Sequence, residues 1–92
     1  MDDLMSEQAT VFTIDLCGRL ADKAGSVIEL SIDHSELDVA EIRRRIAQSI
    51  PALGEEILSP RVRGCVNDML VSDSKAIAAG DRIAFFPPVS GG

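Results

Sequence analysis

Several residue types that bring chemistry or bulk to a protein core are scarce in this chain. Its 92 residues include no Trp, no Tyr, three Phe, two Cys and one His. A hydrophobic content of 46% is enough for one domain, but its core must be aliphatic. No run of about 18 apolar residues is present, so no segment is expected to span a membrane.

The same scarcity argues against an active site or a metal centre in the folded body. Cys17 and Cys65 lie far apart and form no CxxC pair, so no metal site is predicted. Two reduced, buried or half-buried thiols are favoured, although the sequence alone leaves a disulfide open. His34 lies in a polar segment and is interpreted as surface. The GxGxxG pattern is absent, and we expect no bound cofactor.

Basic residues are outnumbered by acidic ones. The chain has 9 Lys and Arg against 15 Asp and Glu, a net charge of −6. This balance argues against nucleic acid and anionic membranes as partners. It fits a soluble carrier that docks on basic partner surfaces. The first residues, MDDLMSEQAT, lack the basic-then-apolar order of a signal peptide, so a cytoplasmic location is expected.

The spacing of hydrophobic residues predicts an α+β domain. Residues 1–9 show no period and are expected to be a disordered extension. Alternation of apolar and polar residues predicts strands, the first two forming a hairpin. The predicted strands cover residues 10–16, 27–32, 64–67, 69–71 and 82–86. One amphipathic helix, packed on a mixed sheet of four to five strands, completes the expected architecture.

Local signals refine the connections. The helix is predicted to begin at Asp38, with Glu41 three residues later as in a capping box, and to end at Pro51. Residues 18–26 are interpreted as a polar connection, and residues 52–58 as a short helix or a turn. The run 43–45, three arginines, is expected to be a solvated helix face rather than a docking patch.

The last eight residues, FFPPVSGG, are the most distinctive stretch. Pro87 and Pro88 fix φ, lack N–H donors and end the preceding strand. The terminal Gly-Gly lets an enzyme channel close around bare backbone. We therefore predict a domain over residues 10–86 and a flexible tail over 87–92, which can reach roughly 20 Å. Phe86, at the root of the tail, is either a partner anchor or a core residue.

If the tail is the functional part, the reactive group is the carboxylate of Gly92. A carboxylate needs activation, and adenylation by ATP on another protein is the plausible route. Attack by sulfur then yields a thiocarboxylate, whereas attack by a thiol and then a lysine yields an isopeptide bond. The residues alone leave both outcomes open.

The tail, with Ala79 to Ala84 before it, resembles the C-terminus of the small subunits of molybdopterin synthase. These are sulfur carriers of the MoaD/ThiS ubiquitin-like family. The segment 65–71, CVNDMLV, is similar to the family's Val-Asn hairpin. The resemblance implies a ubiquitin-like β-grasp fold whose first and last strands are adjacent and parallel.

The resemblance also implies a function, that of a non-catalytic sulfur-donor subunit. A ubiquitin-activating-type enzyme would adenylate Gly92 with ATP, and a sulfur donor would convert it to a thiocarboxylate. The large synthase subunit would then use it to put dithiolene sulfur on cyclic pyranopterin monophosphate, within a heterotetramer. Residue by residue, Gly92 carries the sulfur. The threaded tail and its partner-contacting root are Val89, Ser90 and Gly91, with Phe86, Pro87 and Pro88.

One departure and several alternatives accompany this resemblance. After the first strand the family often has an Arg-Glu pair, where this chain has Ala21-Asp22, with Arg19 nearby. The alternatives are a sulfur carrier for thiamine biosynthesis or tRNA thiolation, a ubiquitin-like protein modifier, and a binding module with an incidental tail. The double proline counts against the thiamine carriers, whose tails usually lack it.

Overall fold

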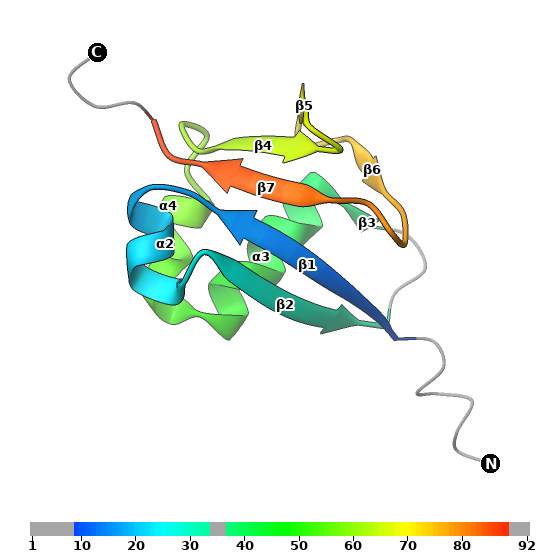
Figure 1. The fold of residues 1–92 in the computed structure, drawn as a ribbon, viewed down its shortest axis with the longest axis horizontal. Coiled ribbons are helices and arrows are strands. Elements are labelled where there is room, and N and C mark those ends of the chain that lie inside the picture. Colours follow the sequence, from blue (N-terminus) through cyan, green and yellow to red (C-terminus); the bar gives the residue numbers. More distant parts are fainter. Residues whose placement is uncertain (1–8, 34–36, 89–92) are drawn as a thin grey trace.

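A computed structural model describes residues 9–33 and 37–88 of the chain (Figure 1). His34 and the predicted tail residues Val89, Ser90, Gly91 and Gly92 lie outside the described residues, as does most of the predicted N-terminal extension. The elements in chain order are β1 (Thr10–Leu16), α2 (Arg19–Ala24), β2 (Val27–Ile32), β3 (Leu37–Asp38), α3 (Val39–Ser49), the 3-10 helix η1 (Pro51–Leu53), α4 (Gly54–Ile57), β4 (Arg63–Val66), β5 (Met69–Val71), β6 (Ala76–Ile77) and β7 (Ile83–Phe86).

The first and last strands lie side by side at the centre of the main sheet. The strand order is β2-β1-β7-β4-β5, and β1 and β7 run parallel, as their arrows show in Figure 1. The other neighbours in this sheet pair antiparallel, including the predicted β1–β2 hairpin. The short strands β3 and β6 form a second pair. The parallel central pair confirms what the family resemblance implied.

The core lies between this sheet and helix α3, which crosses one face of it (Figure 1). The predicted apolar stripe of α3 is buried, and it packs against the inward residues of β1 and β7. Asp38 caps the helix by accepting the N–H of Glu41 at 2.9 Å. The fully buried side chains of this core include Ile14, Ile42, Ile46, Ile83 and Phe85. A mixed five-stranded sheet grasping one main helix is the β-grasp arrangement, so the predicted fold class is confirmed.

The interpretation of residues 18–26 as a polar connection was wrong, because Arg19–Ala24 is the helix α2. Its Leu20 is completely buried in the core. A six-residue segment is too short for its apolar residues, Leu20, Ala21 and Ala24, to show helical periodicity. Gly18 and Gly25, both with positive φ, bound this helix instead of breaking a loop.

The expectation of a solvated arginine face at residues 43–45 also needs correction. Arg44 and Arg45 do form ion pairs with Glu41, at 2.6 and 2.8 Å, on the outer side of α3. Arg43, however, is only 6% exposed. It follows Val39 by four residues and precedes Ile46 by three, so it lies on the buried stripe.

Candidate partner-binding site at the tail root

The predicted tail leaves the domain at the end of the central strand β7. Phe85 points into the core and is fully buried, whereas Phe86 is 41% exposed on the outer face of the sheet. Successive residues of a strand face opposite sides, which explains this difference. The N–H of Cys17 donates to the carbonyl oxygen of Phe85 at 3.2 Å, so the β1–β7 contact continues up to the tail root. The structure therefore favours the partner-anchor interpretation of Phe86.

Pro87 is half-buried, and it packs on the glycine that precedes α2. A Cβ atom on Gly18 would lie 2.8 Å from Cγ of Pro87, closer than real contacts allow. Gly18 also has φ 58° and ψ −137°, a conformation that residues with a side chain rarely adopt. Only glycine allows both this backbone conformation and the close approach of Pro87. The β1–α2 junction, where Gly18 lies, therefore contacts the first residue of the tail.

The loop on the other side of the tail root is held by Arg43. Its guanidinium donates to the carbonyl oxygens of Ile57 at 2.7 Å, Ser59 at 3.1 Å and Val62 at 2.6 Å. Its Nε donates to Asp73 at 3.0 Å. These carbonyl groups lie at the end of α4 and in the loop before β4, where the buried cation supplies hydrogen-bond donors in place of regular secondary structure. The loop that carries Pro60 and Arg61 is thus fixed against α3.

Between this loop and the outer face of β4, β5 and β7 lies a groove of about 600 Å³, which we call the tail-root groove. The strand register brings its sheet residues together, since Arg63 pairs with Phe86 and Cys65 pairs with Leu70. Its lining consists of Pro60, Arg61, Arg63, Cys65, Leu70, Phe86, Pro87 and Pro88. The predicted root residues Phe86, Pro87 and Pro88 are therefore gathered at one site.

The Val-Asn hairpin motif has a structural role at the start of β7. Asn67 and Asp68 adopt φ 53° and 69°, as predicted for this tight turn. The side-chain amide of Asn67 donates to Asp81 at 3.1 Å and accepts the N–H of Arg82 at 3.0 Å. The N–H of Ala78 donates to Asp81 at 2.8 Å, and this bond, followed by that from Asn67, lowers the pKa of Asp81.

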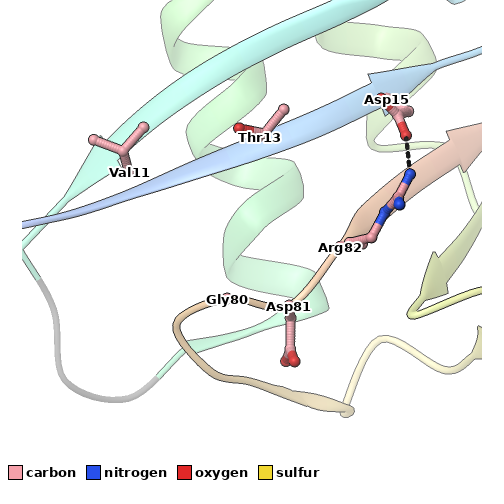
Figure 2. Close-up of a pocket in the computed structure, with 6 residues that line it drawn as sticks. All are labelled: Val11, Thr13, Asp15, Gly80, Asp81 and Arg82. Atoms are coloured by element: carbon pink, nitrogen blue, oxygen red, sulfur yellow. Dashed lines mark ion pairs between the residues drawn. The ribbon is translucent and has the colours of Figure 1, made fainter.

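A second hollow, of about 290 Å³, lies on the outer face of β1 next to this turn (Figure 2). Figure 2 shows Arg82 reaching toward Asp15, at 3.9 Å, while Asp81 points away from both. The two carboxylates therefore do not converge as an acid–base pair. The hollow is lined by Val11, Thr13, Asp15, Gly80, Asp81 and Arg82.

Sequence reasoning missed the residues that hold the tail root in place. Arg43 could have been found, because it shares helical spacing with the buried stripe. Gly18 and the groove residues Arg61 and Arg63 gave no such signal, since their roles depend on contacts between distant segments. Cys17 and Cys65 are free, half-buried thiols, as favoured from the sequence. In the part of the chain that the structure describes, no helix is long and apolar enough to cross a membrane.

Comparisons with known proteins found one matching family and several solved structures of similar fold. Residues 14–92 match the ThiS family. SAMP1 from Haloferax volcanii superposes with a TM-score of 0.75 at 26% identity, covering 89% of this chain and 99% of that chain. SAMP1, the small archaeal modifier protein 1, from Methanosarcina acetivorans gives 0.67 at 22%, covering 91% and 98%.

A third solved structure is a complex of subunits 1 and 2 of molybdopterin-converting factor from Helicobacter pylori. One of its chains matches with a TM-score of 0.58 at 24% identity, covering 90% of this chain and 100% of that chain. No curated protein sequence matches. The likenesses to solved structures agree with the ubiquitin-like β-grasp fold described above.

Proposed function

The chain belongs to the ThiS family. We propose that it is a sulfur carrier that acts through the carboxylate of Gly92. In the proposed cycle, a ubiquitin-activating-type enzyme joins this carboxylate to AMP and releases pyrophosphate from ATP. A sulfide-level sulfur donor then displaces AMP and leaves a thiocarboxylate. The folded domain positions the tail and contributes no catalytic group of its own.

The observation that carries the proposal is the position of the tail root. Residues 87–92 follow the central strand directly, and their first residue, Pro87, is seated against Gly18. The exposed Phe86 lies beside it on the outer face of the sheet. A tail that leaves a rigid core at one defined point can be presented to an enzyme at low entropic cost. This arrangement supports a carrier more than an incidental terminal extension.

For the pathway, we propose that the sulfur is delivered to molybdopterin through a large synthase subunit. The double proline at 87–88 and the resemblance of residues 79–92 support this choice. The solved Helicobacter pylori complex, which joins subunits 1 and 2 of molybdopterin-converting factor, supports a large-subunit partner. In this role the thiocarboxylate donates dithiolene sulfur to cyclic pyranopterin monophosphate within a heterotetramer.

A second candidate is a ubiquitin-like protein modifier. Its support is the likeness to the small archaeal modifier protein of Haloferax volcanii, at 26% identity over 89% of this chain. Adenylation of Gly92 is common to both candidates, and they differ only in the nucleophile that receives the acyl group. Carriers for thiamine biosynthesis and tRNA thiolation share the same first steps.

The first experiment is an intact-mass measurement after incubation with ATP, a candidate activating enzyme and sulfide. We expect a shift equal to one oxygen replaced by sulfur. Two control chains, one without Gly92 and one with a residue added after it, should show no shift. Both should melt at the temperature of the unchanged protein, because terminal residues contribute little stability.

The outcomes separate the candidates. A mass shift that persists without Gly92 would show that another group is modified and would contradict the proposal. Adducts on lysines of other proteins, without a thiocarboxylate, would favour the modifier. If the thiocarboxylate forms, the modified chain can be mixed with the large subunit and cyclic pyranopterin monophosphate. Formation of the dithiolene then tests the molybdopterin pathway itself.

A further inference from the structure

Helix α2 is too short to hold its position by itself. It spans six residues, and its N-cap is Gly18, which has no side chain to cap it. Isolated helices shorter than about 12 residues are marginal in water, so such a segment depends on contacts with the rest of the fold. One of these contacts is Leu20, which is completely buried in the core. A second set of contacts is ionic.

Glu56 of α4 pairs with two cations of α2. Its carboxylate lies 3.3 Å from Nε of Arg19 and 3.1 Å from Nζ of Lys23. Arg19 and Lys23 are four residues apart and therefore lie on one side of the helix. The Oε1 atom of Glu56 is shielded from solvent, so this carboxylate depends on its cations for stabilisation. The two pairs join α2 to α4 at the end of the sheet where β7 ends (Figure 1).

The position of α2 is linked to the conformation of Gly18. The carbonyl oxygen of Gly18 accepts the N–H groups of Ala21 at 3.0 Å and Asp22 at 3.3 Å, in the first turn of the helix. Pro87 rests on this glycine, and it has no N–H of its own to pair with a neighbouring strand. A shift of α2 would therefore move the surface that Pro87 contacts.

The space beside the tail root leaves room for such a shift. Arg19 and Glu56 line a hollow of about 140 Å³ together with Pro87 and Pro88. The ion pair and the first two tail residues thus border the same cavity. If α2 moved, the two prolines could move into this space, and the tail would leave the domain in more than one direction.

We propose that Glu56 is a positioning residue for the tail. By holding α2 it fixes, through the contact of Gly18 with Pro87, the direction in which residues 87–92 leave the domain. This inference rests on the proposed carrier function, because the direction matters only if the C-terminal carboxylate must reach a nucleotide on the activating enzyme. In this role Glu56 acts through other residues and takes no part in the chemistry.

The kinetic consequence follows from separating two events. The domain first docks on the enzyme, and the tail then enters the channel that leads to the nucleotide. A tail that leaves in one direction enters from most docked complexes, whereas a tail that leaves in several directions enters from a fraction of them. Loss of Glu56 therefore lowers kcat, while KM, which docking sets, stays the same.

The first test needs no enzyme. In the unchanged chain, a nuclear Overhauser effect should connect the Hα atoms of Gly18 with the ring of Pro87, because the two residues are in contact. Glu56→Lys adds a cation beside the two cations of α2, and we expect this signal to fall at least about two-fold. Glu55→Lys is the matched control, since it makes the same charge change at the neighbouring, exposed residue of α4. Its signal should match that of the unchanged chain.

The second test is steady-state adenylation by an activating enzyme that modifies the unchanged chain. Glu56→Lys should lower kcat about five-fold and leave KM within about two-fold. Glu55→Lys should change neither value by more than about 1.5-fold. If Glu56→Lys melts early, Glu56→Gln replaces it, with a decrease in kcat of about three-fold.

The same measurement in a Pro87→Gly background separates positioning from stability. Glycine has no ring to rest on Gly18, so this background has already lost the contact, and its kcat should be low from the start. Adding Glu56→Lys should then change kcat by less than about two-fold, because both changes interrupt the same series of contacts. A residue that only stabilises the domain would lower kcat equally in both backgrounds.

Each result supports or overturns the inference. An unchanged signal between Gly18 and Pro87 in Glu56→Lys would show that α2 keeps its position without the ion pairs. A raised KM with unchanged kcat would assign Glu56 to contact with the enzyme, and equal decreases in both backgrounds would assign it to stability. Each of these three results overturns the positioning role, but the thiocarboxylate still forms and the carrier function stands. If the unchanged chain is not adenylated at all, the carrier function fails and this inference falls with it.

Discussion

Arg43 joins three parts of the molecule that are distant in sequence. Its guanidinium satisfies carbonyl groups in the loop between α4 and β4 and pairs with Asp73 after β5. It also lies 5.2 Å from the centre of the Phe85 ring, close enough for a cation–π contact. A buried charge is costly unless its donors are used, and here the loop carbonyls use them. The residue therefore couples the tail-root groove to the core.

We predict that Arg43→Met lowers the free energy of unfolding by about 3 kcal/mol, because buried carbonyl groups lose their donor. Urea unfolding monitored by circular dichroism measures this change. Arg44→Met is the matched control, since Arg44 is exposed and forms its ion pair with Glu41 on the outer side of α3. Its effect should stay within about 0.5 kcal/mol. Similar losses in the two variants would show that the loop does not depend on Arg43.

Hydrogen bonds connect two turns next to β7, the strand that carries the tail. The β4–β5 turn, at Asn67, bonds to the turn before β7, at Asp81. The backbone N–H of Asn67 also donates to the carbonyl oxygen of Arg82 at 2.8 Å. These contacts set the register of β7 against β4, and a shift of one residue would turn Phe86 inward and Phe85 outward.

This junction predicts a dependence of stability on pH. The N–H of Ala78 and the amide of Asn67 hold the pKa of Asp81 below its ordinary value of 3.8 in the folded state. The stabilisation is therefore fully present above pH 3.8 and is lost as the pH falls through the lower, folded-state pKa. Asp81→Asn should be less stable than the unchanged chain at neutral pH, and the difference should shrink below that value.

Denaturant unfolding at a series of pH values measures the difference. Asp22→Asn is the matched control, because its exposed side chain takes part in neither turn. It should unfold like the unchanged chain at neutral pH. A gap between Asp81→Asn and the unchanged chain that stays constant down to the lowest pH would contradict the assigned role of Asp81.

In the whole molecule, the residues that stabilise the fold and the residues proposed to carry the function belong to different parts of the chain. The core lies between α3 and the sheet, whereas the proposed reactive group belongs to residues that follow Pro88. A domain built in this way can tolerate changes in its tail without unfolding, and it can lose function without losing stability. The tail-root groove lies at the boundary between the two parts.

We therefore predict that Gly91→Val leaves the melting temperature unchanged but reduces thiocarboxylate formation at least ten-fold. A β-branched side chain widens the backbone that the enzyme channel must admit. Thermal unfolding and intact mass measure the two effects. Ser90→Ala is a milder control that makes the side chain smaller. A melting temperature lowered by many degrees in Gly91→Val would show that the tail is structural instead.

Elements whose signals are local could be predicted from the amino-acid sequence. Period-two alternation predicted β1, β2 and β7, the apolar stripe with its Asp38 cap predicted α3, and Asn67-Asp68 predicted a turn with positive φ. These signals suffice because strand, helix and turn preferences act within a few residues. The tail motif could likewise be identified from the sequence alone. The role of Gly92 as its reactive end stays a prediction.

The residues that surround the tail root could not be predicted, because they come together through contacts between distant segments. Whether Phe86 was core or exposed depended on the register of β7 against β4. Arg43, interpreted as surface from its neighbours, is buried because the 57–62 loop brings carbonyl groups to its guanidinium. Gly18 and Arg61 acquire their positions from chain segments far along the sequence. Contacts between distant segments leave no periodic pattern, and folding alone brings them together.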